Sequence, residues 1–163
     1  MARPPRQIER VEFSAGAHAQ IVGWMNRLAG AEDGWINLVP RIADIDERPT
    51  SLRLFTLFSG NGTGVTMCTW VPGSHDRRGR TQPSLGITHV TGRRVVAELR
   101  ALEVPVSETW IVEQDHPRRG LVLRVPLDEP NEAVLAWSMC AVAALASGPI
   151  RRWQADIHLP ATS

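Results

Sequence analysis

Residues 110–127 read WIVEQDHPRRGLVLRVPL, and this stretch decides the fold class of the chain. Two strand-like runs flank residues 117–120 (PRRG), where proline presets φ for a turn and glycine accepts a positive φ. With these four residues as the loop, Glu113 lies opposite Arg124, an opposite-charge pair that helps to fix the register. The stretch therefore predicts an antiparallel β-hairpin.

The predicted register divides the hairpin into an apolar and a polar face. It places Gln114 and His116 on the otherwise apolar face and Asp115 on the opposite face. The apolar members of the first face are Trp110, Val112, Leu121, Leu123, Val125 and Leu127. Such alternation is typical of a hairpin that covers a hydrophobic core with one face.

Turn and helix signals divide the rest of the chain into short elements. We expect a helix over 14–29, because apolar residues recur there at helical spacing and the glycine at position 30 can end it. A second hairpin is expected over 52–71, around the Asn-Gly turn signal at 61–62, with both faces apolar. Further helices are expected over 92–103, with Thr91 as N-cap, and from about 128 to 147. The remaining expected strands cover 35–39, 84–90 and 150–159, and residues 1–13 form a tail or an edge strand.

The order of these elements predicts the architecture. From residue 65 onward it contains strand, helix, strand, strand, helix and strand, the split βαβ pattern of ferredoxin-like folds. We therefore expect one α+β domain over 1–163, with a mixed or antiparallel sheet and helices mainly on one face. The N-terminal helix and extra strands would extend this ferredoxin-like core.

The composition excludes several classes of protein. The 163 residues are 43% hydrophobic and 21% charged, as in ordinary globular domains, and no apolar run approaches the ~20 residues of a membrane span. No signal-peptide pattern follows the N-terminal arginines, so a cytoplasmic protein is expected. All 18 basic residues are arginine and tyrosine is absent, a bias typical of GC-rich bacterial genomes. The net charge of +1 gives no general case for nucleic acid as a partner.

No dense motif for metal or nucleophilic chemistry is present. No GxSxG surrounds a serine, and Cys68 and Cys140 lie in separate apolar runs, where we expect them to be small buried hydrophobes. Neither HxxxH nor HExxH spacing occurs among the histidines, which are His18, His75, His89, His116 and His158. The sequence therefore predicts neither a metal nor a cofactor.

One constellation points to anion binding. Residues 86–94 read GITHVTGRR, and the expected helix start would place free backbone N–H groups beside two arginines, whose charges oppose the helix dipole until an anion binds. The hairpin tip adds polar groups, including His116 as the candidate acid/base residue. The candidate ligand-binding residues are Arg78, His89, Thr91, Arg93, Arg94, Gln114, His116 and Arg119. The plain alternative is that these arginines are solvated and that His116 has a structural role.

Two functions fit the sequence, which does not decide whether the protein is an enzyme. The first is a non-catalytic binding or interaction domain, homodimeric through the doubly apolar hairpin over 52–71. The second is an enzyme or ligand-binding protein for a small anionic or phosphorylated compound. Its site would require the 73–82 loop, the 89–94 helix start and the 114–119 tip to converge. Nucleic-acid binding would require the arginines to form one stripe, and no membrane partner is expected.

Overall fold

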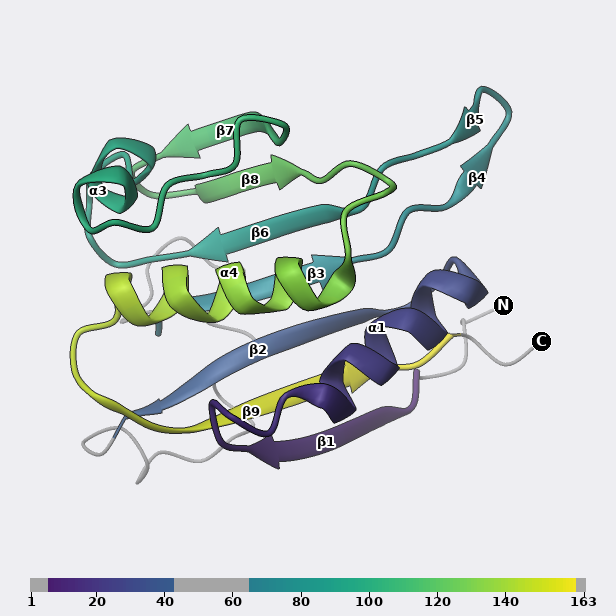
Figure 1. The fold of residues 1–163 in the computed structure, drawn as a ribbon, viewed down its shortest axis with the longest axis horizontal. Coiled ribbons are helices and arrows are strands. Elements are labelled where there is room, and N and C mark those ends of the chain that lie inside the picture. Colours follow the sequence, from purple (N-terminus) through teal and green to yellow (C-terminus); the bar gives the residue numbers. More distant parts are fainter. Residues whose placement is uncertain (1–5, 43–64, 161–163) are drawn as a thin grey trace.

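An antiparallel sheet of seven strands forms the framework of the described chain (Figure 1). The computed structural model describes residues 6–42 and 65–160. The strands lie in the order β1–β9–β2–β3–β6–β8–β7, and every neighbouring pair is antiparallel. Their bounds are β1 (Ile8–Phe13), β2 (Trp35–Ile42), β3 (Met67–Val71), β6 (Ser84–Thr88), β7 (Ile111–His116), β8 (Gly120–Arg124) and β9 (Ile150–His158). A separate two-stranded hairpin consists of β4 (His75–Asp76) and β5 (Gly79–Arg80).

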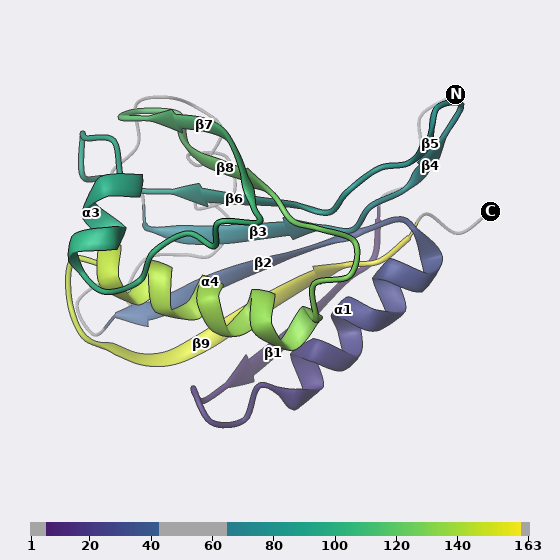
Figure 2. The ribbon, with the colours of Figure 1, turned by 45° about the horizontal axis from the view of Figure 1, so that its top comes forward.

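Two long helices cover one face of this sheet (Figures 1 and 2). They are α1 (Ala19–Ala31) and α4 (Asn131–Leu145), and the short helix α3 (Val96–Ala101) lies at one end of the sheet. Alternate strand residues such as Ile36 and Leu38 are buried in the core between the two layers. None of the helices in the described ranges is long and apolar enough to span a bilayer.

The buried stripe of α1 matches its sequence pattern. Ile21, Trp24, Met25 and Leu28 recur at helical spacing and are all buried, as predicted. The helix begins at Ala19 rather than at residue 14, because Ser14 instead starts a turn in which its carbonyl accepts a hydrogen bond from the Ala17 N–H at 3.0 Å. It also continues past the glycine at position 30 and ends at Ala31.

The α+β class and the antiparallel sheet are confirmed, whereas the ferredoxin-like core is not. Strand β8 lies between β6 and β7, as a split βαβ unit requires. A ferredoxin-like core would also place β9 beside β6, but β2 and β3 lie between them. Strands β2 and β3 are therefore inserted into the middle of the sheet, whereas β1 lies at its edge beside β9.

The hairpin of 110–127 forms, but the predicted register is wrong. His116 pairs with Gly120, and the register shifts between Val112 and Gln114. Gly120 has a φ of 86°, and a Cβ atom there would lie 2.3 Å from the carbonyl oxygen of Ile87. This glycine therefore belongs to the strand packed against β6, and the loop has three residues, a common connection when a glycine of positive φ follows.

The register shift is a β-bulge in β7, and it reverses the face of the sheet on which the residues beyond it lie. Asp115 pairs with buried Leu121 and so lies on the helix side, whereas Gln114 pairs with Val122 on the opposite face. Both positions are the reverse of the prediction. The expected charge pair still forms across the bulge, with Arg124 Nε donating to Glu113 Oε1 at 2.6 Å.

Several other boundaries differ from the expected ones. Strand β2 continues through Pro40 to Ile42, and the polar loop over 72–83 contains the β4–β5 hairpin. Cys68 is buried as expected, but Cys140 is exposed on α4. The predicted strand over 52–58, its turn at 61–62 and most of the loop over 41–51 lie outside the described residues.

Candidate anion-binding site

The candidate residues divide between two ends of the sheet. Residues 73–82 precede the start of β6 and residues 89–94 follow its end, so the two segments lie at opposite ends of that strand (Figure 1). The three segments of the predicted site therefore do not converge. Arg78 lies on the β4–β5 hairpin, and the other candidates lie together at the opposite end: His89, Thr91, Arg93, Arg94, Gln114, His116 and Arg119. We call the region formed by residues 89–94 and 114–120 the sheet-end site.

Asp115 joins the two segments of the sheet-end site. Its carboxylate accepts hydrogen bonds from the Val95 N–H at 2.8 Å and the Val96 N–H at 3.3 Å. These contacts cap α3 from a neighbouring strand, so the helix begins at Val96 and Thr91 is not its N-cap, contrary to prediction. Asp115 therefore already bonds to backbone N–H groups at the start of α3, where we expected an anion from solution to bind. The sequence contained no local signal for this role, because it depends on the bulge in β7.

His89 is a buried imidazole beneath this connection. Its Nδ1 lies 3.0 Å from the Thr91 hydroxyl, and its buried Nε2 has no hydrogen-bond partner among the described residues. Burial lowers the pKa of His89, although the nearby carboxylates of Asp115 and Glu98 partly oppose that effect. The imidazole is therefore neutral at pH 7 and adds no positive charge to the sheet-end site.

Gln114 and His116 shape the hairpin tip. The Nδ1 of His116 accepts hydrogen bonds from the backbone N–H groups of Arg118 and Arg119, both at 3.1 Å. That nitrogen is therefore used as a hydrogen-bond acceptor within its own loop. Gln114 donates to the carbonyls of Arg119 and Gly120, both at 3.2 Å. These contacts account for both side chains as structural groups of the tip.

Three arginines at the sheet-end site, unlike Gln114 and His116, are not held by hydrogen bonds of their side chains to described residues. Arg94, Arg118 and Arg119 are exposed, and none forms an ion pair or side-chain hydrogen bond with another described residue. Arg93 differs, because it pairs with Glu98 at 3.0 Å. The site therefore presents three guanidinium groups near the single carboxylate of Asp115, a local balance of three positive charges against one negative.

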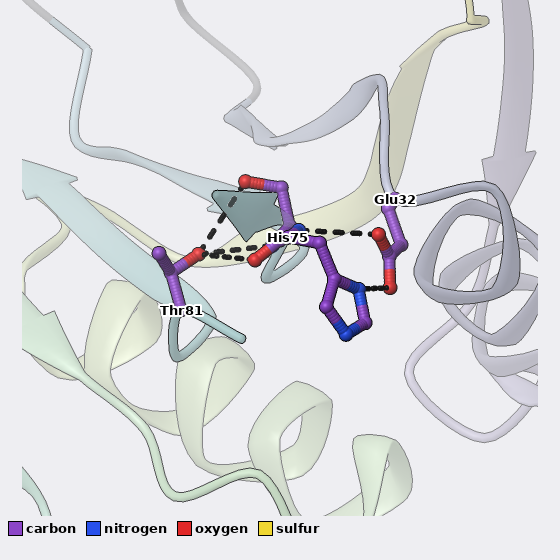
Figure 3. Close-up of polar contacts among 4 residues, drawn as sticks. Glu32, His75 and Thr81 are labelled. Carbon is purple, nitrogen blue, oxygen red and sulfur yellow. Dashed lines mark hydrogen bonds and ion pairs between the residues drawn. The ribbon is translucent and has the colours of Figure 1, made fainter. Parts of the chain in front are cut away.

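The 73–82 loop contains a carboxylate–imidazole pair (Figure 3). Glu32 Oε1 lies 2.5 Å from His75 Nδ1, and Glu32 Oε2 accepts a hydrogen bond from the His75 N–H at 3.1 Å. The Thr81 hydroxyl donates to the Ser74 carbonyl at 3.0 Å, and the second imidazole nitrogen of His75 points away from it (Figure 3). The arrangement therefore lacks the hydroxyl–imidazole contact of a nucleophile and its base.

A largely buried polar cluster lies on the sheet face away from the helices. Thr69 donates to Asn37 Oδ1 at 2.8 Å, and Asn37 Nδ2 lies 3.2 Å from His158 Nε2. Gln154 donates to Asp156 at 2.7 Å on the same strand as His158. Because these groups satisfy one another, we interpret the cluster as structural. Its sequence signal, polar residues at alternate positions of β9, did not distinguish a solvated face from a buried one.

Among the described residues, no three His, Cys, Asp or Glu side chains lie close enough to hold a metal ion. Burial raises the pKa of Cys68 to about 12, so its thiol is protonated at neutral pH. No family model matches the chain, and no curated protein or solved structure is significantly similar to it.

Proposed function

We propose that this chain is a non-catalytic binding domain that takes a small anionic ligand, such as a phosphorylated compound, at the sheet-end site. The observation that carries the proposal is the presence there of three exposed arginines without a carboxylate partner among the described residues. By comparison, Arg10 and Arg124 on the sheet form ion pairs with Asp156 and Glu113. Guanidinium groups bind carboxylate and phosphate oxygens in bidentate geometry, which favours an oxyanion over other ligands.

The expected affinity is low because the site is exposed. A contact between opposite unit charges near water contributes about 1 kcal/mol. Three such contacts, together with one or two hydrogen bonds, correspond to a Kd near 1 mM for a simple phosphate. A larger ligand that also contacts uncharged parts of the tip would bind more tightly.

The proposed absence of catalysis is supported by how the titratable groups are used. His116, the candidate acid/base residue, accepts two backbone hydrogen bonds within its own turn. Asp115 caps α3, and the imidazole of His75 is directed away from the hydroxyl of Thr81. Each of these groups therefore has a structural use that competes with a role in proton transfer.

The proposal is tested by titrating pyrophosphate into 15N-labelled protein at constant ionic strength, with sodium chloride as the reference salt. We expect the largest shifts in the amides of residues 89–94 and 116–120, and we expect Arg118→Ala/Arg119→Ala to abolish them. The matched control is Arg77→Ala/Arg78→Ala, which removes the same charge at the other end of the sheet and should leave the shifts unchanged. Equal loss in both variants would show only nonspecific attraction and would contradict the proposal.

A further inference from the structure

Residues 73–82, which we call the arginine arm, project beyond the sheet at the end opposite the sheet-end site (Figures 1 and 2). The arm consists of β4, β5 and their flanking residues, with the sequence GSHDRRGRTQ. Arg77, Arg78 and Arg80 are exposed on it, and none of the three forms an ion pair with another described residue. Three positive charges therefore lie within four residues on a narrow projecting hairpin.

The hairpin is well defined by its own hydrogen bonds. At its base the Thr81 N–H donates to the Ser74 carbonyl at 2.7 Å, and the Thr81 hydroxyl accepts from the Ser74 N–H at 2.9 Å. The chains cross so closely there that a Cβ atom on Gly73 would lie 2.1 Å from the Thr81 carbonyl oxygen. At the tip, Asp76 Oδ1 accepts a hydrogen bond from the Arg78 N–H at 2.7 Å. Asp76 therefore uses its carboxylate to form the turn.

Glu32 attaches the arm to the body of the protein (Figure 3). It follows the last residue of α1 in a left-handed conformation with φ of 54°, which a non-glycine residue rarely adopts. From there its carboxylate contacts both the backbone N–H and the imidazole Nδ1 of His75, at 3.1 and 2.5 Å. We call this pair of contacts the Glu32–His75 latch. It reduces the number of orientations that the arm can adopt relative to the sheet.

We propose that the arginine arm is a preorganised contact for the phosphate backbone of duplex nucleic acid and that the Glu32–His75 latch holds it in its binding orientation. The overall net charge of +1 gives no case for such a partner, but the local charge of the arm does. The arm is a projecting two-stranded ribbon with three exposed arginines within four residues, so its charges suit a linear array of phosphates.

The composition of the arm distinguishes among polyanionic partners. Residues 73–82 include no Phe, Tyr or Trp, and their one aromatic ring, the imidazole of His75, is held by Glu32, so the arm lacks the row of aromatic side chains on which successive bases of a single strand stack. They also include no large apolar side chain that could insert into a lipid interface. Backbone phosphates of a duplex need neither feature, because positive charge and shape are sufficient for sequence-independent contact.

The test measures fluorescence polarisation of short labelled DNA and RNA duplexes of equal sequence at several salt concentrations. Three phosphate contacts predict a slope of log K against log salt of about −2.7. We expect Arg77→Ala/Arg78→Ala/Arg80→Ala to lower the affinity at least tenfold at low salt and to flatten the slope toward zero. The matched control Arg100→Ala/Arg151→Ala/Arg152→Ala removes three exposed positive charges that lie outside both the arm and the sheet-end site, and it should change the affinity less than twofold.

The latch is tested separately with Glu32→Ala. Charge alone predicts tighter binding, because this variant has one negative charge fewer. Loss of preorganisation predicts weaker binding, by about threefold to tenfold. Circular dichroism and the melting temperature show whether each variant is folded. Unchanged or tighter binding by folded Glu32→Ala would overturn the role of the latch.

Three results would overturn the assignment of the partner. The first is no binding of the wild-type protein to either duplex at low salt. The second is arm-dependent binding to a single strand that is as tight as binding to the duplex. The third is arm-dependent binding to phosphatidylserine vesicles in the absence of duplex binding. Because the proposed function uses the opposite end of the sheet and a different probe, either proposal can fail without the other.

Discussion

Replacing Asp115 by alanine removes the cap that connects β7 to α3. The carboxylate accepts hydrogen bonds at 2.8 and 3.3 Å from the Val95 and Val96 N–H groups, and Val95 is buried. Loss of an N-cap costs about 1 kcal/mol, with a range of about 0.5–2. Since the lost acceptor is charged and leaves a buried donor without a partner, we expect a decrease of about 2 kcal/mol in the free energy of unfolding. For a domain of this size the melting temperature should fall by about 4–8 °C.

Urea denaturation of the variants provides the measurement. The midpoint should shift without a change in m-value, because a lost cap leaves the buried area of the native state nearly unchanged. Asp115→Asn keeps one acceptor oxygen and should show about half of the loss. Glu108→Ala is the control, an exposed carboxylate with no hydrogen bond to another described residue, and should change stability by less than about 0.5 kcal/mol. If Asp115→Ala is no more destabilising than Glu108→Ala, the assigned capping role is wrong.

Other perturbations test separate parts of the structure. Gly120→Ala should destabilise by about 1–3 kcal/mol in thermal unfolding, because the residue has φ of 86° and its Cβ would meet the Ile87 carbonyl oxygen. Burial lowers the pKa of both His89 and His158 below the usual value of 6.5. As the pH falls below 6.5, the unfolded chain therefore binds more protons at these two residues than the folded chain does, and the free energy of unfolding should decrease. That contribution is fully present above pH 6.5, and His89→Gln/His158→Gln should reduce the acid sensitivity seen in urea titrations at successive pH values. Homodimerisation through residues 52–71 predicts a dimer in sedimentation velocity at micromolar concentration, and a strict monomer would contradict it.

The local elements of this protein were largely predictable from sequence. The apolar stripe of α1, the turn signal of the β7–β8 hairpin and the alternation of β9 each depend on residues close together in the chain. Such patterns report which side of an element is apolar, and the antiparallel α+β class follows from their order. The 89–94 segment and the hairpin tip lie close together, but the predicted site also required the 73–82 loop, which lies at the other end of β6.

The polar face of β9 shows where local pattern stops being informative. Gln154, Asp156 and His158 alternate with apolar residues as in a half-exposed strand, yet all three are buried and bonded to one another or to neighbouring strands. Strand β9 is an inner strand, paired with β1 on one side and β2 on the other, and its polar side chains bond to groups on both neighbours. No residue in the strand itself encodes that position.

Sequence alone therefore determined the types of element and the apolar face of α1. Tertiary structure decided the strand order, the bulge in β7, the capping of α3 by Asp115 and the separation of Arg78 from the other candidates. The physical reason is the range of the interactions. Periodicity and turn propensity act over a few residues, whereas strand pairing joins segments distant in the chain, and a register shift of one residue reverses which face a side chain occupies.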